Sequence, residues 1–144
     1  MLMKGCLLTL SLLSGCTLEV EDVSVVIESP LIVHAGQEFI IQAKIKNTDP
    51  SSTQVLVSID LQNEYLQGVA VLNTEPRYAD IVSIPFVGKS FVFNAPINAG
   101  GELNIVIHAQ ALAVGDYNSL ADFCINSDYT FISDTLRTVV QPVE

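Results

Sequence analysis

Apolar and polar residues alternate along much of the chain after residue 22. In the segment 38–46 every second residue is apolar and would lie on one face: Phe39, Ile41, Ala43 and Ile45. The residues between them would lie on the other face: Ile40, Gln42, Lys44 and Lys46. Side chains of a β-strand point alternately to the two faces of its sheet, so the pattern predicts a strand with one buried and one solvated face.

The same period of two recurs elsewhere, and the inward-facing residues are expected to be Val23, Val25 and Ile27; Val55, Val57 and Ile59; Phe91 and Phe93; and Leu103, Ile105, Ile107 and Ala109. Shorter or less regular strands are expected at 31–33, 69–72, 120–127 and 129–141. Turn or loop residues fill 34–37, 47–52, 73–80, 96–101 and 115–119, and 62–68 suits one helical turn that ends at Gly68. Turns spaced about every 8–12 residues are typical of sandwiches. We therefore predict an all-β fold, an immunoglobulin-like antiparallel β-sandwich of about seven to eight strands.

The first 15 residues differ from the rest of the chain. Lys4 is followed by an apolar stretch at 7–13, and then by the small residues Ser14 and Gly15. A basic start, a short apolar region and a small-residue exit are typical of a secretory leader. The stretch is shorter than the roughly 20 apolar residues that cross a bilayer. The alternative, an ordinary N-terminal core element, fits poorly because no acidic residue precedes Glu19.

The last residues of this leader, Leu13 to Cys16, resemble the bacterial lipoprotein lipobox, in which an aliphatic residue, a small residue and Gly or Ala precede Cys. The resemblance implies cleavage between Gly15 and Cys16, and a diacylglyceryl group on the Cys16 sulfur. It divides the chain into a signal peptide (1–15), a lipidated cysteine with its tether (16–22) and a β-sandwich domain (23–142). Two or three acyl chains would hold the protein firmly on a membrane.

The residue after the lipobox cysteine bears on the destination. Thr17 stands there rather than Asp, and by analogy with enterobacterial sorting this favours the outer membrane or the cell surface. The expected location is therefore the bacterial cell envelope.

The cysteine content leaves one thiol to explain. Cys6 would leave with the leader and Cys16 would be lipidated, so Cys124 would have no disulfide partner in the domain. Two interpretations of Cys124 stay open. It is either a free thiol, accessible to another chain in an oxidising compartment, or a small buried core residue, and we favour the buried one.

Composition and charge narrow the class of partner. Hydrophobic residues make up 49% of the 144 residues and charged residues 15%, which is ample apolar material for the core of one domain. The formal charge is -10, and loss of Lys4 with the leader would bring it to about -11. A phosphate backbone would be repelled, so no nucleic-acid partner is expected. Scattered carboxylates keep a β-rich surface soluble.

A second resemblance covers residues 30–120. A Gly-Gln turn at 36–37 precedes a long strand that ends in Asn-Thr-Asp at 47–49, and a later Ala-Gly-Gly-Glu turn precedes a second long strand that leads to Gly-Asp-Tyr at 115–117. This order is similar to bacterial immunoglobulin-like domains of the CARDB type. Those domains often have Gly where Asp49 stands. The resemblance implies a spacer, binding or adhesion module and supplies no catalytic residues.

Residues with catalytic or metal-binding chemistry are few. His34 and His108 each lack a second His or Cys at ligand spacing, so no zinc site is predicted. The segment 116–122 faintly resembles a calcium loop, but Leu120 and Ala121 stand where an EF-hand needs an oxygen ligand and a glycine. A looser calcium site shared by several turns stays open. No nucleophile motif or phosphate loop is found, so no catalytic residue, metal or cofactor is predicted and the chain is not expected to be an enzyme.

The leading hypothesis is a lipid-anchored module of the cell envelope that serves protein binding, adhesion or spacing. Its expected contacts are the membrane, through the lipid on Cys16, and a protein of the envelope. The alternative is an accessory subunit of an envelope transport or secretion complex that docks through an exposed strand edge. The oligomeric state is left open.

Overall fold

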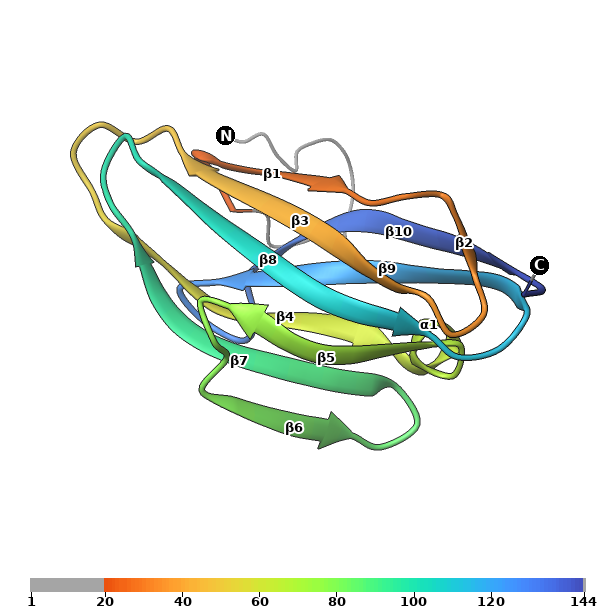
Figure 1. Cartoon of the computed structure of the whole chain (residues 1–144). Helices are drawn as coiled ribbons and strands as arrows, with labels where there is room; N and C mark the ends of the chain where they lie inside the picture. Colours follow the sequence, from red (N-terminus) through yellow and green to blue (C-terminus); the bar gives the residue numbers. More distant parts are fainter. Residues whose placement is uncertain (1–19, 144) are drawn as a thin grey trace, which may run out of the picture.

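A computed structural model describes residues 20–143, which form ten strands and one helical turn (Figure 1). The elements are β1 (Val23–Glu28), β2 (Ile32–His34), β3 (Glu38–Asn47), β4 (Gln54–Gln62), α1 (Asn63–Leu66), β5 (Val69–Glu75), β6 (Asp80–Ile84), β7 (Gly88–Ile97), β8 (Glu102–Ala111), β9 (Gly115–Ile125) and β10 (Phe131–Gln141). The predicted leader, the Gly15–Cys16 cleavage point and the sorting residue Thr17 lie outside the described residues.

The strands form two sheets that pack face to face, which confirms the predicted all-β sandwich. One sheet has four strands in the order β1-β3-β8-β5, and the other has six in the order β2-β10-β9-β4-β7-β6. Neighbouring strands run antiparallel, except for β2, which pairs with the end of β10 in parallel. Figure 1 shows the four-stranded sheet in front of the six-stranded one, with β6 extending beyond the edge of its partner sheet.

The core lies between the sheets and follows the alternation in the sequence. On β3 the predicted inward residues are buried and the residues between them are exposed. On β8, Ile105, Ile107 and Ala109 are likewise buried between the sheets, whereas the residues between them and Leu103 at the start of the strand are half-buried. The predicted helical turn is also present, as α1, and it precedes Gly68.

The inward face of β4 was predicted wrongly. Val55 and Val57 are half-buried, and Leu56 is the residue that lies in the core with Ile59. The reason is a β-bulge, since the pairing of β4 with both neighbours shifts between Leu56 and Ser58. One extra residue in a strand reverses the faces of the residues that follow, so Leu56 and Ile59 point the same way although three positions separate them.

Two segments predicted as loops are largely strand. The segment 115–119 begins β9, because its residues pair with β10 from Leu136 to Val140. Of the segment 73–80, only 76–79 connects strands, and β6 begins at Asp80 as a strand that the sequence pattern did not predict. In both segments the ladder to a neighbouring strand supplies the backbone hydrogen bonds, and this outweighs local turn propensity.

Asn47 ties together the loops at the end of the sandwich where β1 begins. Its side chain is fully buried, and Nδ2 donates to the carbonyl oxygens of Ser52, Ile97 and Asn98 at 2.8, 3.1 and 3.2 Å. Its Oδ1 accepts from the backbone N–H of Asp49 at 3.0 Å. One amide therefore holds the β3–β4 and β7–β8 loops together.

Replacing Asn47 with Ala should lower the free energy of unfolding by about 2–4 kcal/mol, because three carbonyls lose their donor in a buried site. Asn104→Ala is the matched control, since Asn104 is an exposed amide on β8. Urea unfolding of both variants measures the difference in the free energy of unfolding, provided that its dependence on urea concentration is the same in both. A loss for Asn47→Ala no larger than that of the control would show that the loops hold without this amide.

Candidate interaction surface

The end of the sandwich opposite the start of β1 gathers four connecting segments. They are the β2–β3 turn, α1, the β6–β7 turn and the β8–β9 loop, at the right of Figure 1. Backbone hydrogen bonds join them: Asn63 N–H donates to Val87 O at 2.8 Å, and Leu112 N–H donates to Gly68 O at 2.9 Å. We call this group of segments the distal end, because it lies far from residue 23, where the predicted tether meets the domain.

Two tyrosines make the distal end a fixed surface. Tyr65 of α1 is fully buried, and its hydroxyl lies 2.7 Å from Oγ1 of the buried Thr138. Burial raises the pKa of Tyr65 to about 12. Tyr117 lies over Gly68 so closely that a Cβ at Gly68 would come within 2.1 Å of the ring. The Tyr117 hydroxyl donates to the carbonyls of Ala113 and Val114, which holds the β8–β9 loop.

Apolar side chains are exposed on this fixed frame. Phe86 in the β6–β7 turn is fully exposed, and Val87, Leu112 and Val114 are each more than half exposed. Single exposed apolar residues are ordinary, but a group of them on one set of adjoining loops is typical of a contact site. The distal end therefore exposes apolar side chains on two of its loops.

Phe86 also has an unusual backbone. Its φ is 65°, and the turn is closed by a hydrogen bond from Val87 N–H to Ile84 O at 3.0 Å, with Pro85 in the second position. The third position of such a turn is normally Gly or Asn, since a bulky side chain is strained at positive φ. The other non-glycine residues at positive φ in the described chain are Asp or Asn. The ring is fully exposed and packs against nothing in the core, so core packing does not explain why a bulky residue stands at this strained position.

Cys124 is buried, which contradicts the accessible-thiol interpretation and agrees with the burial we favoured, but it lies on the outward face of the six-stranded sheet and not in the core cluster between the sheets. Its side chain is 4% exposed and lies on the face of β9 opposite to Phe123, with Ser58 of β4 and Phe131 of β10 as its paired neighbours. The thiol donates to Oδ2 of Asp60 at 3.6 Å. Burial, followed by the charge of Asp60, raises the pKa of Cys124 to about 11. The sequence did not single out Asp60, because only the pairing of β4 with β9 brings it to the thiol.

The two histidines are far from this thiol. His34 ends β2, and His108 lies on the outward face of the four-stranded sheet, with Nε2 2.8 Å from Oε2 of Glu75. Asp116, in the faint calcium-loop segment, is held by Arg137 through contacts of 3.0 and 2.7 Å. Within residues 20–143 no three His, Cys, Asp or Glu side chains are grouped so that they could hold a metal ion.

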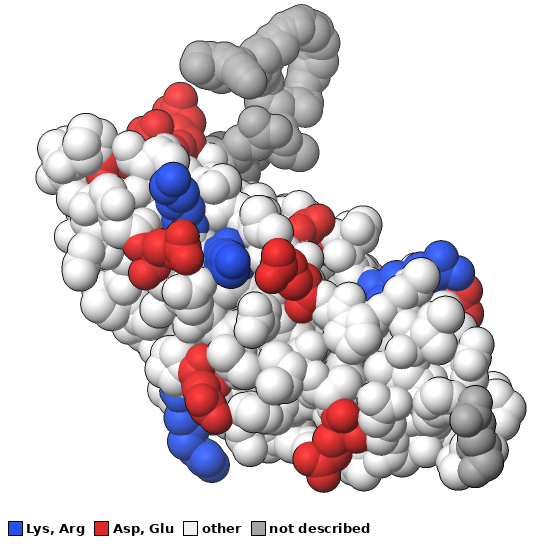
Figure 2. Space-filling model, turned by 45° about the horizontal axis from the view of Figure 1, so that its top comes forward, with Lys and Arg blue, Asp and Glu red and all other residues white. Residues whose placement is uncertain are grey.

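The charged residues form no concentrated patch on the face shown in Figure 2. Acidic side chains lie apart from one another there, some beside a basic one, with wide uncharged areas between them. The part of the chain that the structure describes also has no helix long and apolar enough to span a membrane.

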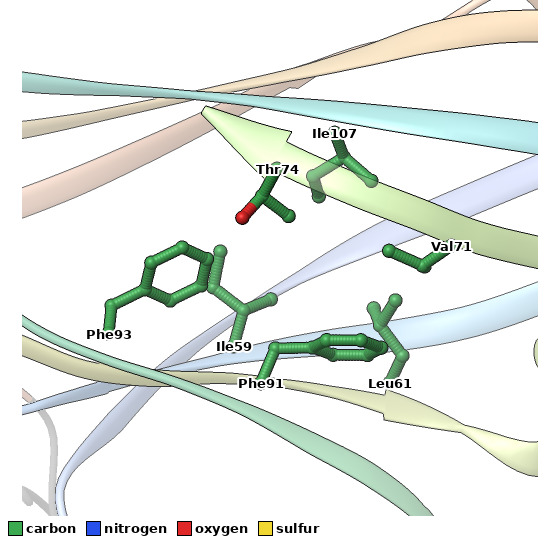
Figure 3. Close-up of a pocket in the computed structure, with 7 residues that line it drawn as sticks. All are labelled: Ile59, Leu61, Val71, Thr74, Phe91, Phe93 and Ile107. Atoms are coloured by element: carbon green, nitrogen blue, oxygen red, sulfur yellow. The ribbon is translucent and has the colours of Figure 1, made fainter. Parts of the chain in front are cut away.

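A small gap in the core is apolar and nearly filled. It has a volume of about 10 Å³ and lies between the sheets, where side chains from β4 and β7 face others from β5 and β8 (Figure 3). Its lining consists of Ile59, Leu61, Val71, Thr74, Phe91, Phe93 and Ile107. The Thr74 hydroxyl already donates to Pro76 O and accepts from Tyr78 N–H. A gap of this size holds at most one water molecule and is a packing defect of the core.

Comparison with protein-family models and comparison with curated proteins each found no match. Similar folds occur among solved structures. The cupredoxin domain of amoB from Nitrosocaldus yellowstonii is 14% identical with a TM-score of 0.51, over 87% of this chain and 90% of that chain. The sporulation control protein Spo0M from Bacillus subtilis is 17% identical with a TM-score of 0.52, over 85% of this chain and 50% of that chain. The likeness to both lies in the β-sandwich fold.

The Cys124 thiol should react slowly with a disulfide reagent at pH 8 in the folded protein and rapidly in urea, because it is buried and protonated. A Cys124→Ala variant serves as the control, because any reagent that it consumes has reacted with the other cysteines. Fast and complete modification of native Cys124 would contradict the buried placement.

The same group makes stability depend on alkaline pH. The pKa of Cys124 in the fold, about 11, lies above its ordinary value of 9.0, so the unfolded chain loses the proton first. Its stabilising contribution is therefore complete below pH 9 and is lost as the pH rises toward 11. Tyr65 acts in the same direction from pH 10 upward. Unfolding curves of Cys124→Ala should show a smaller loss between pH 9 and 10 than those of the parent chain.

Proposed function

We propose that this chain is a lipid-anchored, non-catalytic module of the bacterial cell envelope that binds or spaces other envelope components. The observation that carries the proposal is the lipobox sequence at Leu13 to Cys16, followed within seven residues by the first strand of a β-sandwich. The resemblance to CARDB-type domains supports the same class of module. Attachment through the lipid would leave the sandwich as the contact surface.

The positions of the two ends of the sandwich support a contact at the distal end. The tether joins the domain at β1, beside the loops that Asn47 holds, whereas the exposed apolar residues of the distal end lie on the opposite side (Figure 1). A partner that contacts Phe86 and Leu112 would therefore approach from the side away from the tether. Tyr65 and Tyr117 keep those loops in place, which reduces the entropy lost on binding.

The description of one similar fold as a cupredoxin does not extend to this chain. Blue-copper sites combine two His and one Cys on the same metal. Here Cys124 and His108 lie on the outward faces of different sheets, and His34 ends the short strand β2. The described residues therefore do not assemble that set of ligands, and a contact function fits them better.

A second candidate function is an accessory subunit of an envelope transport or secretion complex. The open edge of β6 favours it, because an extended segment of another protein can add a strand to such an edge. In that case the contact would run along the side of the sandwich and not over its distal loops.

Cys16→Ser should release the full chain from membranes or leave it with its leader uncut, since the acylated sulfur would be gone. Cys6→Ser is the matched control, because Cys6 lies in the predicted leader and should not affect anchoring. Membrane fractionation together with mass spectrometry of the amino terminus measures both effects. A Cys16→Ser protein that is processed and remains on membranes as the parent does would contradict the anchor.

Phe86→Gly should show whether the Phe86 side chain serves the stability of the fold or the contact with a partner. Glycine relieves about 1–2 kcal/mol of strain at φ 65° and costs about 0.5–1 kcal/mol of chain entropy, so the free energy of unfolding should rise by about 0.5–1 kcal/mol. Crosslinking in intact envelopes should show a weaker contact to the partner, with Ile40→Gly as a control in an exposed strand position. A variant that is more stable and crosslinks as strongly as the parent would rule out the distal end as the contact.

A further inference from the structure

β6 is an edge strand with one open side. It is hydrogen-bonded to β7 alone, over the register from Asp80 with Val92 to Ile84 with Gly88, without a bulge. Every second residue of an antiparallel edge strand presents its N–H and C=O groups to the open side. These groups can accept one further strand.

The other sheet edges carry features that hinder pairing. β5 has a bulge between Val71 and Asn73, and β2 has only three residues. β1 carries a charge at Glu28 and packs near β10. The part of β10 that extends beyond β2 carries Asp134 and Arg137. Bulges, short strands, charges and prolines are the usual protections of an edge.

β6 has fewer of these protections, and they lie at its start, where Ile81 N–H donates to Oδ1 of Asp80 at 2.8 Å, so a pairing strand would have to displace that carboxylate. Its five residues are Asp-Ile-Val-Ser-Ile, with a single charge at the first position and the nearest proline after the last. Ile81 is 38% exposed and Val82 is 46% exposed, although they lie on opposite faces of the strand. A strand that is apolar on both faces and open along one side is suited to being covered by another strand.

We propose that the occupant is a second copy of this chain, paired through β6 in antiparallel orientation about a two-fold axis at Val82. The pairing would join two six-stranded sheets into one continuous sheet. Each Val82 would lie opposite its counterpart, with Ile81 opposite Ser83 and Asp80 opposite Ile84. A two-fold contact of this kind is closed, so association stops at the dimer.

Among the possible self-pairings, the positions of the charges favour this register, in which β6 is complementary to a second copy of itself. The chain has a formal charge of -10, so a contact between two copies must keep the carboxylates apart. With the axis at Val82, Asp80 of each copy faces an isoleucine, and no like charges lie opposite one another. An axis at Asp80 would set two carboxylates face to face and would leave most of β6 unpaired. The self-pairing that uses all five residues is therefore also the one without charge repulsion.

The proposal is tested by a disulfide across the axis. In a paired antiparallel strand, opposite Cα atoms lie about 4.5–5.5 Å apart, which is within the range that a disulfide spans. Val82→Cys in the full chain, purified in detergent and mildly oxidised, should form a linked dimer. Ile40→Cys is the matched control, because Ile40 is also 46% exposed on a strand. The parent chain gives the background from its own cysteines. A Val82→Cys protein that links no more than Ile40→Cys overturns the proposal.

A second measurement requires no oxidant. The parent chain should sediment as a dimer, and Val82→Lys should sediment as a monomer, because two ammonium groups would meet at the axis. Ile40→Lys should remain a dimer. A monomeric parent chain, or a Val82→Lys protein that stays dimeric, contradicts pairing through β6. A Val82→Cys protein that links in envelopes to a different protein, and not to itself, would favour the accessory-subunit function instead.

The proposed pairing through β6 does not depend on the lipid at Cys16. The Cys16→Ser variant therefore tests the dimer and the anchor separately. Cys16→Ser should leave the Val82 disulfide and the dimer unchanged. If that variant loses the dimer, the association belongs to the acyl chains or the detergent micelle, and the proposal fails while the anchor stands.

Discussion

Burial of one face of β3 and β8 against one face of the six-stranded sheet is the interaction on which the rest of the structure depends. The described chain contains no disulfide and no grouped metal ligands, and its one described cysteine is a lone thiol. Stability must therefore come from apolar area removed from water, roughly 25 cal/mol for each Å², together with satisfied backbone hydrogen bonds. Where this packing ends, loop carbonyls have no strand partner. Polar side chains such as Asn47 donate hydrogen bonds to them there.

The sequence pattern predicted this packing correctly where apolar and polar residues alternate without interruption. The prediction failed where the pairing of strands interrupts that alternation. Ile41 and Ile45 were placed correctly because β3 is regular along its whole length. Val57 was not, because a bulge depends on how two neighbouring strands are registered, and no local pattern reveals it. Gly115 and Asp116 have turn propensity, yet they pair with β10, which lies more than 20 residues away along the chain. The exposed apolar residues of the distal end were missed for a similar reason, since the β6–β7 turn and the β8–β9 loop reach the same end of the sandwich only after folding.

The buried placement of Cys124 bears on the kind of function this chain can have. The thiol is held protonated by burial and by Asp60, and the histidines lie on other parts of the surface. Reactive side chains are thus kept apart, whereas apolar ones are brought together at the distal loops and along β6. This distribution leaves two exposed apolar regions on the described chain: the distal loops, and the edge formed by β6.

The direction of β1 has a mechanical consequence. β1 begins at Val23, at the end of the sandwich away from the distal loops, and is paired with β3 from Val23–Asn47 to Glu28–Gln42. A pull between a membrane anchor and a partner held at the far loops would run along the strand axes. The hydrogen bonds between β1 and β3 would then be loaded in shear, all at the same time. Such loading resists force better than an unzipping geometry, in which the hydrogen bonds break one after another.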